Sequence, residues 1–98
     1  MTCIVNLQIP VKKEAKAKVY ADLVTLVVAT RTKPSCRWIY LAENDETGVI
    51  EVVSLWDSKA SYQEYLKWRQ SYGGFDGLAN VLDGERVVRY LEVQHAFP

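Results

Sequence analysis

The stretch Val49-Ile-Glu-Val-Val-Ser-Leu-Trp56, followed directly by Asp57 and Ser58, marks a change from strand to helix. Its β-branched and aromatic residues favour extended structure, whereas Asp and Ser are typical helix N-caps. We expect the helix to continue to the Gly73-Gly74 pair, because glycine breaks helical structure. Residues 36–42 are also rich in strand-forming residues, and residues 43–48 are a polar turn, so the two runs predict a hairpin.

Two more strands and one more helix are expected outside this hairpin. Residues 2–9 alternate in the manner of a strand and end at Pro10, with Ile4, Asn6 and Gln8 on one face and Cys3, Val5, Leu7 and Ile9 on the other. Residues 12–31 predict a helix that ends before Pro34, with an apolar stripe made of Ala15, Val19, Leu23, Leu26 and Val27. Residues 75–82 predict a short irregular or helical turn, and residues 86–93 predict the last strand.

The order β-α-β-β-α-β predicts one α+β domain over residues 1–98 with the ferredoxin-like arrangement. In this arrangement a four-stranded antiparallel sheet carries both helices on one face. The other face is bare, and large apolar surfaces on small domains are usually interaction sites. We therefore expect a homodimer formed through the open sheet face by two copies related by a two-fold axis.

The composition excludes several classes of protein. The chain has 98 residues, of which 49% are hydrophobic and 24% charged, and its 12 Lys and Arg balance 12 Asp and Glu. A globular domain is therefore expected rather than a disordered segment, and the lack of a basic stripe argues against a nucleic-acid partner. No apolar run approaches the roughly 20 residues of a membrane span, and no secretory signal is evident, so a cytoplasmic protein without membrane contact is expected.

The cysteines and the single histidine narrow the possible chemistry. Cys3 and Cys36 are far apart and belong to no CxxC pair, so we expect two reduced core thiols. His95 is the only histidine, and it lies in no metal-binding spacing. Neither a dedicated metal site nor a nucleophile–histidine arrangement is therefore expected.

The stretch Val53-Ser-Leu-Trp-Asp-Ser-Lys-Ala-Ser-Tyr-Gln-Glu-Tyr65 places a Trp at a strand end, a polar cap after it and an aromatic residue six positions on. This pattern resembles the antibiotic biosynthesis monooxygenase (ABM) family. The segment Thr30-Arg-Thr-Lys-Pro-Ser-Cys-Arg-Trp-Ile-Tyr40 is similar to that family's helix end and second strand, with Lys33-Pro34-Ser35-Cys36 in place of its EPGC turn. The resemblance covers nearly the whole chain. It implies a homodimeric α+β barrel with a ligand pocket between each sheet and its own helices.

The resemblance also implies an activity, namely cofactor-independent monooxygenation of a hydroxylated aromatic or polycyclic substrate by dioxygen to form a quinone. Trp56 and Tyr62 occupy the places of a Trp and a Tyr that such oxygenases use, whereas Val52 stands where they have Asn. Asn6 is on a neighbouring strand, so we expect it to supply the amide and to be catalytic with Trp56 and Tyr62. The residues expected to bind the substrate are Tyr65, Trp38, Trp68 and Phe75.

Two alternatives stay open. The aromatic residues are also compatible with the packed core of a non-catalytic dimeric ligand-binding or interaction module. A cavity of a few hundred Å³ lined by Asn6, Trp56, Tyr62 and Tyr65 would favour a ligand site, whereas filled space would favour the interaction module. The second alternative, and the third hypothesis in all, is haem degradation, an activity of other members of the family. Asn6 matches those members, but Tyr65 and Phe75 stand where they have a Trp and the iron-ligating His.

Three charged residues and one glycine-rich segment have two interpretations each. Arg37, Glu51 and Arg89 lie inside predicted strands, where a lone buried charge is costly. In the first interpretation these charges pair with one another or reach solvent at the dimer interface. In the second, one of the arginines faces the pocket and holds a phenolate or carboxylate group of the substrate. The segment Gly73-Gly74-Phe75-Asp76-Gly77 is either a plain turn or a lid over the pocket.

Overall fold

The computed structural model describes residues 1–71 and 78–98, and its element order confirms the ferredoxin-like prediction. The four strands form one antiparallel sheet in the order β2-β3-β1-β4, so the two central strands are β3 and β1. The elements are β1 (Cys3–Ile9), the 3₁₀ turn η1 (Lys13–Ala15), α1 (Lys16–Thr30), β2 (Cys36–Glu43), β3 (Ile50–Trp56), α2 (Lys59–Ser71), the 3₁₀ turn η2 (Leu78–Val81) and β4 (Val87–Glu92).

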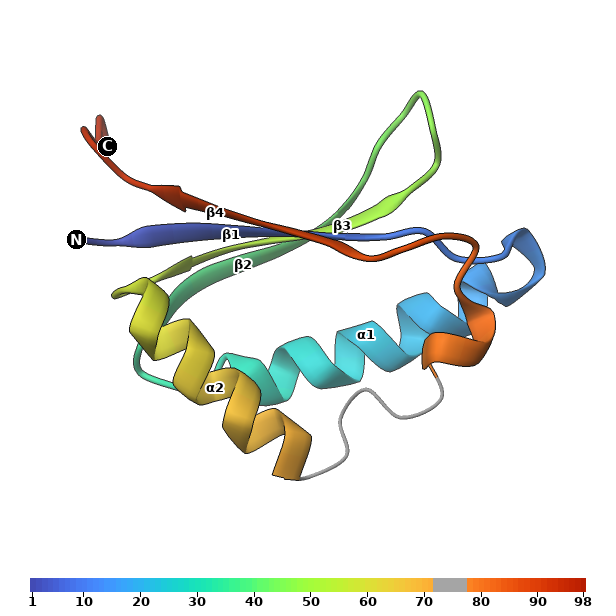
Figure 1. Cartoon of the computed structure of the whole chain (residues 1–98), viewed down its shortest axis with the longest axis horizontal. Helices are drawn as coiled ribbons and strands as arrows, with labels where there is room; N and C mark the ends of the chain where they lie inside the picture. Colours follow the sequence, from blue (N-terminus) through green and yellow to red (C-terminus); the bar gives the residue numbers. More distant parts are fainter. Residues whose placement is uncertain (72–77) are drawn as a thin grey trace.

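Both helices lie against the same side of the sheet, and no described element covers the other side (Figure 1). The strand register decides which side chains face the helices. Cys3 lies opposite Trp56 and Val5 lies opposite Ser54, and all four residues are buried. Since side chains alternate along a strand, the residues between them belong to the open face. The predicted two-faced pattern of residues 2–9 is confirmed.

The core consists of two clusters on the helix side of the sheet. One lies between α1 and the sheet and is made of Ile9, Val19, Leu23 and Ile50. The other joins α2 to the sheet and is made of Cys3, Val5, Cys36, Trp56, Tyr62 and Tyr65. Both cysteines are free and buried, as expected, and burial raises the pKa of the Cys36 thiol. The second cluster contains the aromatic residues that the sequence assigns to a site.

Local hydrogen bonds explain where the strand–helix junction and the hairpin turn form. Ser58 caps α2, because its Oγ accepts a hydrogen bond of 3.0 Å from the backbone N–H of Ser61. Asp57 instead pairs with Arg37, at 2.7 Å between Oδ1 and Nε. In the hairpin turn Gly48 has a φ of +74°, a left-handed conformation that glycine adopts without steric cost.

The observed elements differ from the predicted ones mainly at their ends. The helix expected from residue 12 begins as a 3₁₀ turn, in which the backbone N–H of Ala15 donates to the Lys12 carbonyl at 3.0 Å. The backbone N–H of Lys12 itself donates to the Val81 carbonyl at 2.8 Å and ties this segment to η2. The predicted helix end at Gly73-Gly74 and the proposed lid at residues 73–77 lie outside the described residues. Over the described ranges, no helix combines the length and apolarity needed to cross a membrane.

Candidate ligand-binding site

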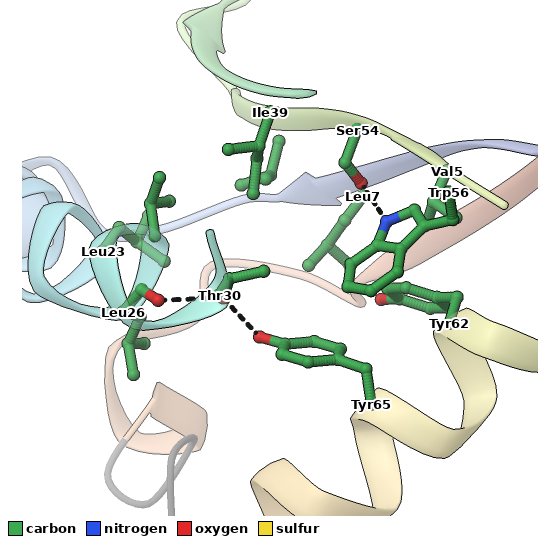
Figure 2. Close-up of a pocket in the computed structure, with 12 residues that line it drawn as sticks. Val5, Leu7, Leu23, Leu26, Thr30, Ile39, Ser54, Trp56, Tyr62 and Tyr65 are labelled. Atoms are coloured by element: carbon green, nitrogen blue, oxygen red, sulfur yellow. Dashed lines mark hydrogen bonds between the residues drawn. The ribbon is translucent and has the colours of Figure 1, made fainter. Parts of the chain in front are cut away.

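The end of β3 and the first turns of α2 bring three aromatic side chains together (Figure 2). Trp56 is 1% exposed, and its ring centroid lies 5.2 Å from that of Tyr62 and 4.9 Å from that of Tyr65. The two tyrosines are three positions apart on α2 and therefore project from one helix face. Strand end, helix cap and helical spacing together build this cluster.

The indole of Trp56 contributes ring surface to the site but no free hydrogen-bond donor. Its Nε1–H donates to the Ser54 Oγ at 2.8 Å (Figure 2). Since an indole has a single donor, none remains for a ligand. The ring supplies an apolar, polarisable wall instead.

Tyr62 provides the donor that Trp56 lacks. The ring is buried, and none of the hydrogen bonds among the described residues uses its hydroxyl. Burial raises the pKa of Tyr62 well above its ordinary value, and the neighbouring Tyr90 and Tyr65 raise it further. Tyr62 therefore keeps its proton throughout the neutral range and acts as a hydrogen-bond donor rather than as a base.

A hydrogen-bond network joins Tyr65 to the end of α1. The Tyr65 hydroxyl lies 2.8 Å from Thr30 Oγ1, which donates to the Leu26 carbonyl at 2.8 Å. Arg69 is 5% exposed and donates to Tyr65 Oη at 3.1 Å, to Thr30 Oγ1 at 3.0 Å and to the Leu26 carbonyl at 3.1 Å. The salt bridges within the described residues do not include Arg69. The buried guanidinium of Arg69 is therefore stabilised by hydrogen bonds to uncharged oxygen atoms, and its bonds to Thr30 and Leu26 connect α2 to α1.

A small pocket lies between these side chains and the sheet, with a volume of about 40 Å³. Ligand sites typically measure about 300–1,000 Å³, so an aromatic ring does not fit here. The pocket is therefore smaller than the cavity of a few hundred Å³ that would favour a ligand site at this place, because the three aromatic side chains fill most of the space. The pocket is lined by Val5, Leu7, Leu23, Leu26, Val27, Thr30, Ile39, Val52, Ser54, Trp56, Tyr62 and Tyr65.

An open groove adjoins the pocket and has a volume of about 500 Å³. Its walls come from α2, from β1 and from the chain on either side of the start of β4, namely Leu7, Tyr62, Leu66, Gln70, Leu82, Gly84, Glu85, Arg86 and Val88. Leu7 and Tyr62 line both spaces. The groove has the volume of a small-molecule site, and the protonated Tyr62 lies at its junction with the pocket.

Asn6 does not belong to this site. It is a neighbour of Val53 and Arg89 in the sheet, and its Nδ2 donates to Glu51 Oε1 at 3.1 Å. The expectation that Asn6 joins Trp56 and Tyr62 in one pocket is wrong. Strands β1 and β3 are neighbours as predicted, but strand alternation directs Asn6 to the open face.

The other predicted binding residues also lie away from the pocket. A β-bulge between Cys36 and Trp38 places Cys36 on the helix side and Trp38 opposite Leu55 on the open face. Trp68 is half-buried on α2, with the Lys33 Nζ 3.7 Å from its ring centroid. Of the predicted substrate-binding residues, Tyr65 lines the pocket, Trp38 and Trp68 do not, and Phe75 lies outside the described residues.

None of the three strand charges faces the pocket. Arg37 forms its salt bridge with Asp57 at the surface, Glu51 accepts from Asn6, and Arg89 is exposed on the open face. The buried arginine is Arg69, which sequence analysis missed. The sequence spacing of Arg69 could have predicted its position. It follows Tyr65 by four positions and Tyr62 by seven, so helical periodicity places it on the same face of the helix.

Comparison with known proteins gives the family. Residues 2–71 match the antibiotic biosynthesis monooxygenase family, and the chain belongs to it. The chain has no match among curated proteins. Within residues 1–71 and 78–98, no three His, Cys, Asp or Glu side chains are grouped so that they could hold a metal ion.

Solved structures agree on the fold. Rv0793 from Mycobacterium tuberculosis is 17% identical with a TM-score of 0.87, and the match covers 98% of each chain. A conserved protein from Methanosarcina mazei Go1 is 16% identical with a TM-score of 0.84, over 93% of this chain and 91% of that one. NE2512, a protein of unknown function from Nitrosomonas europaea, is 11% identical with a TM-score of 0.82, over 99% of this chain and 93% of that one. At these identities the likeness concerns the fold alone.

The network around Arg69 predicts a stability difference between two threonines of α1. Thr30→Val removes an acceptor from Arg69 and from the Tyr65 hydroxyl, and leaving buried polar groups unpaired costs about 1–3 kcal/mol in the free energy of unfolding. Thr25→Val is the control, because Thr25 is exposed and bonds only within its own helix. Urea denaturation followed by circular dichroism measures both variants. Equal midpoints for the two would contradict the role assigned to the network.

Proposed function

We propose that this ABM-family protein is a cofactor-independent monooxygenase that converts a small hydroxylated aromatic or polycyclic molecule to a quinone. The observation that carries the proposal is the position of Tyr62. Its protonated phenol has no hydrogen-bond partner among the described residues and lies where an apolar pocket meets a groove of ligand size. Such a donor suits an oxygen atom that carries negative charge on a flat ring.

The proposed reaction needs no reductant other than the substrate. A ring carbon para to the phenolate oxygen forms a bond to dioxygen and loses its hydrogen, and the O–O bond breaks. One oxygen atom stays on the ring as the second quinone carbonyl. The other leaves as water with the hydrogen of the ring carbon and that of the hydroxyl group. Four electrons pass from the ring to dioxygen, so the atoms and electrons balance.

The side chains of the site have separate parts in this proposal. Tyr62 donates a hydrogen bond to the phenolate oxygen. In this proposal it has the role that the sequence analysis expected for Asn6. Leu7, Leu66 and Val88 line the groove and offer apolar contact to the ring, which also keeps water from the reacting atoms. Trp56 backs Tyr62 and holds its ring in position.

The second candidate is a non-catalytic dimeric ligand-binding or interaction module. The specific observation in its favour is the filled space beneath the sheet, where the pocket measures about 40 Å³ and the Trp56 donor is already bonded to Ser54. Haem degradation, the third reading, gains no support from the site. Tyr65 is buried and bonded to Thr30 and Arg69, and Phe75 lies outside the described residues.

Oxygen uptake and tryptophan fluorescence distinguish the two candidates when hydroxynaphthalenes and hydroxylated anthrones are supplied to the purified protein. The proposal predicts binding together with one dioxygen consumed per quinone formed. Tyr62→Phe should lower kcat by about 10²–10³, because it removes a donor to the developing charge. Tyr40→Phe is the matched control, since Tyr40 lies on the open face, and its kcat should be unchanged. Binding without oxygen uptake would support the module, and activity that survives in Tyr62→Phe would contradict the role of Tyr62.

We further propose that the protein is a homodimer joined through the open sheet face. This face exposes Tyr40, Val87 and Leu91, and exposed apolar surface of this kind marks interaction sites. Asn6 Oδ1 is buried on the same face and has no partner within the described residues. A second copy related by a two-fold axis would cover the apolar side chains and bring polar groups toward this oxygen.

The dimer is tested by charging its interface. Light scattering after size exclusion should give twice the chain mass of 11.2 kDa for the native protein. Leu91→Glu should give the mass of one chain, because the carboxylate would be buried against a second apolar face. Val28→Glu places the same charge on an exposed position of α1 and should remain dimeric. A native protein of single-chain mass at micromolar concentration would overturn the dimer.

A further inference from the structure

We infer that the pocket of about 40 Å³ is the dioxygen site of this protein and that the adjoining groove of about 500 Å³ holds the aromatic ring. This inference rests on the proposed function and assigns the two reactants to two spaces. Leu7 and Tyr62 are the side chains that line both. A gas molecule in the pocket would therefore lie next to the edge of a ring in the groove.

The size of the pocket limits what it can hold. A cavity of about 10–15 Å³ is the least that admits a water molecule, whereas one of about 150 Å³ accommodates benzene. The pocket lies between these limits. It suits a molecule of two or three heavy atoms, such as dioxygen, and excludes a ring.

The lining of the pocket favours an apolar guest over water. Seven of its side chains are aliphatic, namely Val5, Leu7, Leu23, Leu26, Val27, Ile39 and Val52. Of the polar atoms at its edge, Thr30 Oγ1 is fully bonded to Leu26, Tyr65 and Arg69, and Ser54 Oγ accepts from Trp56, which leaves the hydrogen of the Ser54 hydroxyl. A buried water needs two to four polar partners, and the hydroxyls of Tyr62 and Ser54 are the lining groups with hydrogen-bonding capacity left, so the pocket is at the lower limit for water. An uncharged diatomic gas needs none.

The two spaces suit the order of the reaction. Several lining residues are almost fully buried, with Val5 and Trp56 at 1% exposure, so dioxygen would be held away from bulk water. The Tyr62 hydroxyl at the boundary would face the charge that develops when the ring carbon bonds to dioxygen. Binding of the gas and binding of the ring would therefore be altered by different substitutions.

Xenon tests the pocket without any substrate, because it binds small dry apolar cavities. Crystals of the native protein under xenon pressure should show one atom between Val5, Ile39 and Trp56. Ile39→Phe should fill the pocket and abolish this peak. Leu41→Phe is the matched control, since Leu41 is two positions along β2 on the same face but does not line the pocket, and its peak should remain.

Oxygen kinetics complete the test. Ile39→Phe should raise the KM for dioxygen by about tenfold or more and leave the KM for the aromatic substrate unchanged, whereas Leu41→Phe should change neither. A native crystal with no xenon peak, or with ordered water in the pocket, overturns the dioxygen site even if the protein consumes oxygen. A xenon peak in a protein that oxidises none of the hydroxyaromatics overturns the proposed function and the dioxygen role with it.

Discussion

The packing of Trp56 is the contact on which the rest of the molecule depends. Its backbone lies between Cys3 of β1 and Cys36 of β2, so the residue joins three strands at one edge of the core. Its buried ring then receives Tyr62 and Tyr65 from α2. Burial of large aromatic rings contributes strongly to the stability of a small core. The rings of Trp56, Tyr62 and Tyr65 also line the pocket. In this chain the residues that stabilise the fold therefore also form the site.

The sequence predicts the fold well because each element has a local signal. The alternation of residues 2–9, the helical stripe of α1 and the cap at Ser58 are short-range patterns, and their order allows few topologies. The site is harder to predict. Side chains alternate along residues 2–9, so Asn6 faces away from Val5 and from the pocket. Strands β1 and β3 are neighbours, but this alone does not bring the side chains of Asn6 and Trp56 into one pocket. Trp38 is displaced by a bulge, which no regular alternation predicts.

The parts of the site that sequence analysis missed are those made by contacts between distant segments. Thr30 ends α1 and Arg69 belongs to α2, and they meet only because the two helices pack side by side on the sheet. The groove likewise combines α2 with the chain around the start of β4, far along the sequence. Periodicity places Arg69 on the buried face of α2, but it does not identify the oxygens that receive its hydrogen bonds.

The central claim is that a small hydroxyaromatic molecule binds beside Tyr62 on the helix side of the sheet. The three tryptophans report on different places, since Trp56 borders the pocket, Trp38 lies on the open face and Trp68 lies on α2. Their indole N–H signals can be followed by ¹H–¹⁵N NMR during titration with a hydroxynaphthalene, with assignments from Trp38→Phe and Trp68→Phe. A ligand in the groove should shift the Trp56 signal and leave that of Trp38 in place. A shift of the Trp38 signal with Trp56 unmoved would contradict the claim.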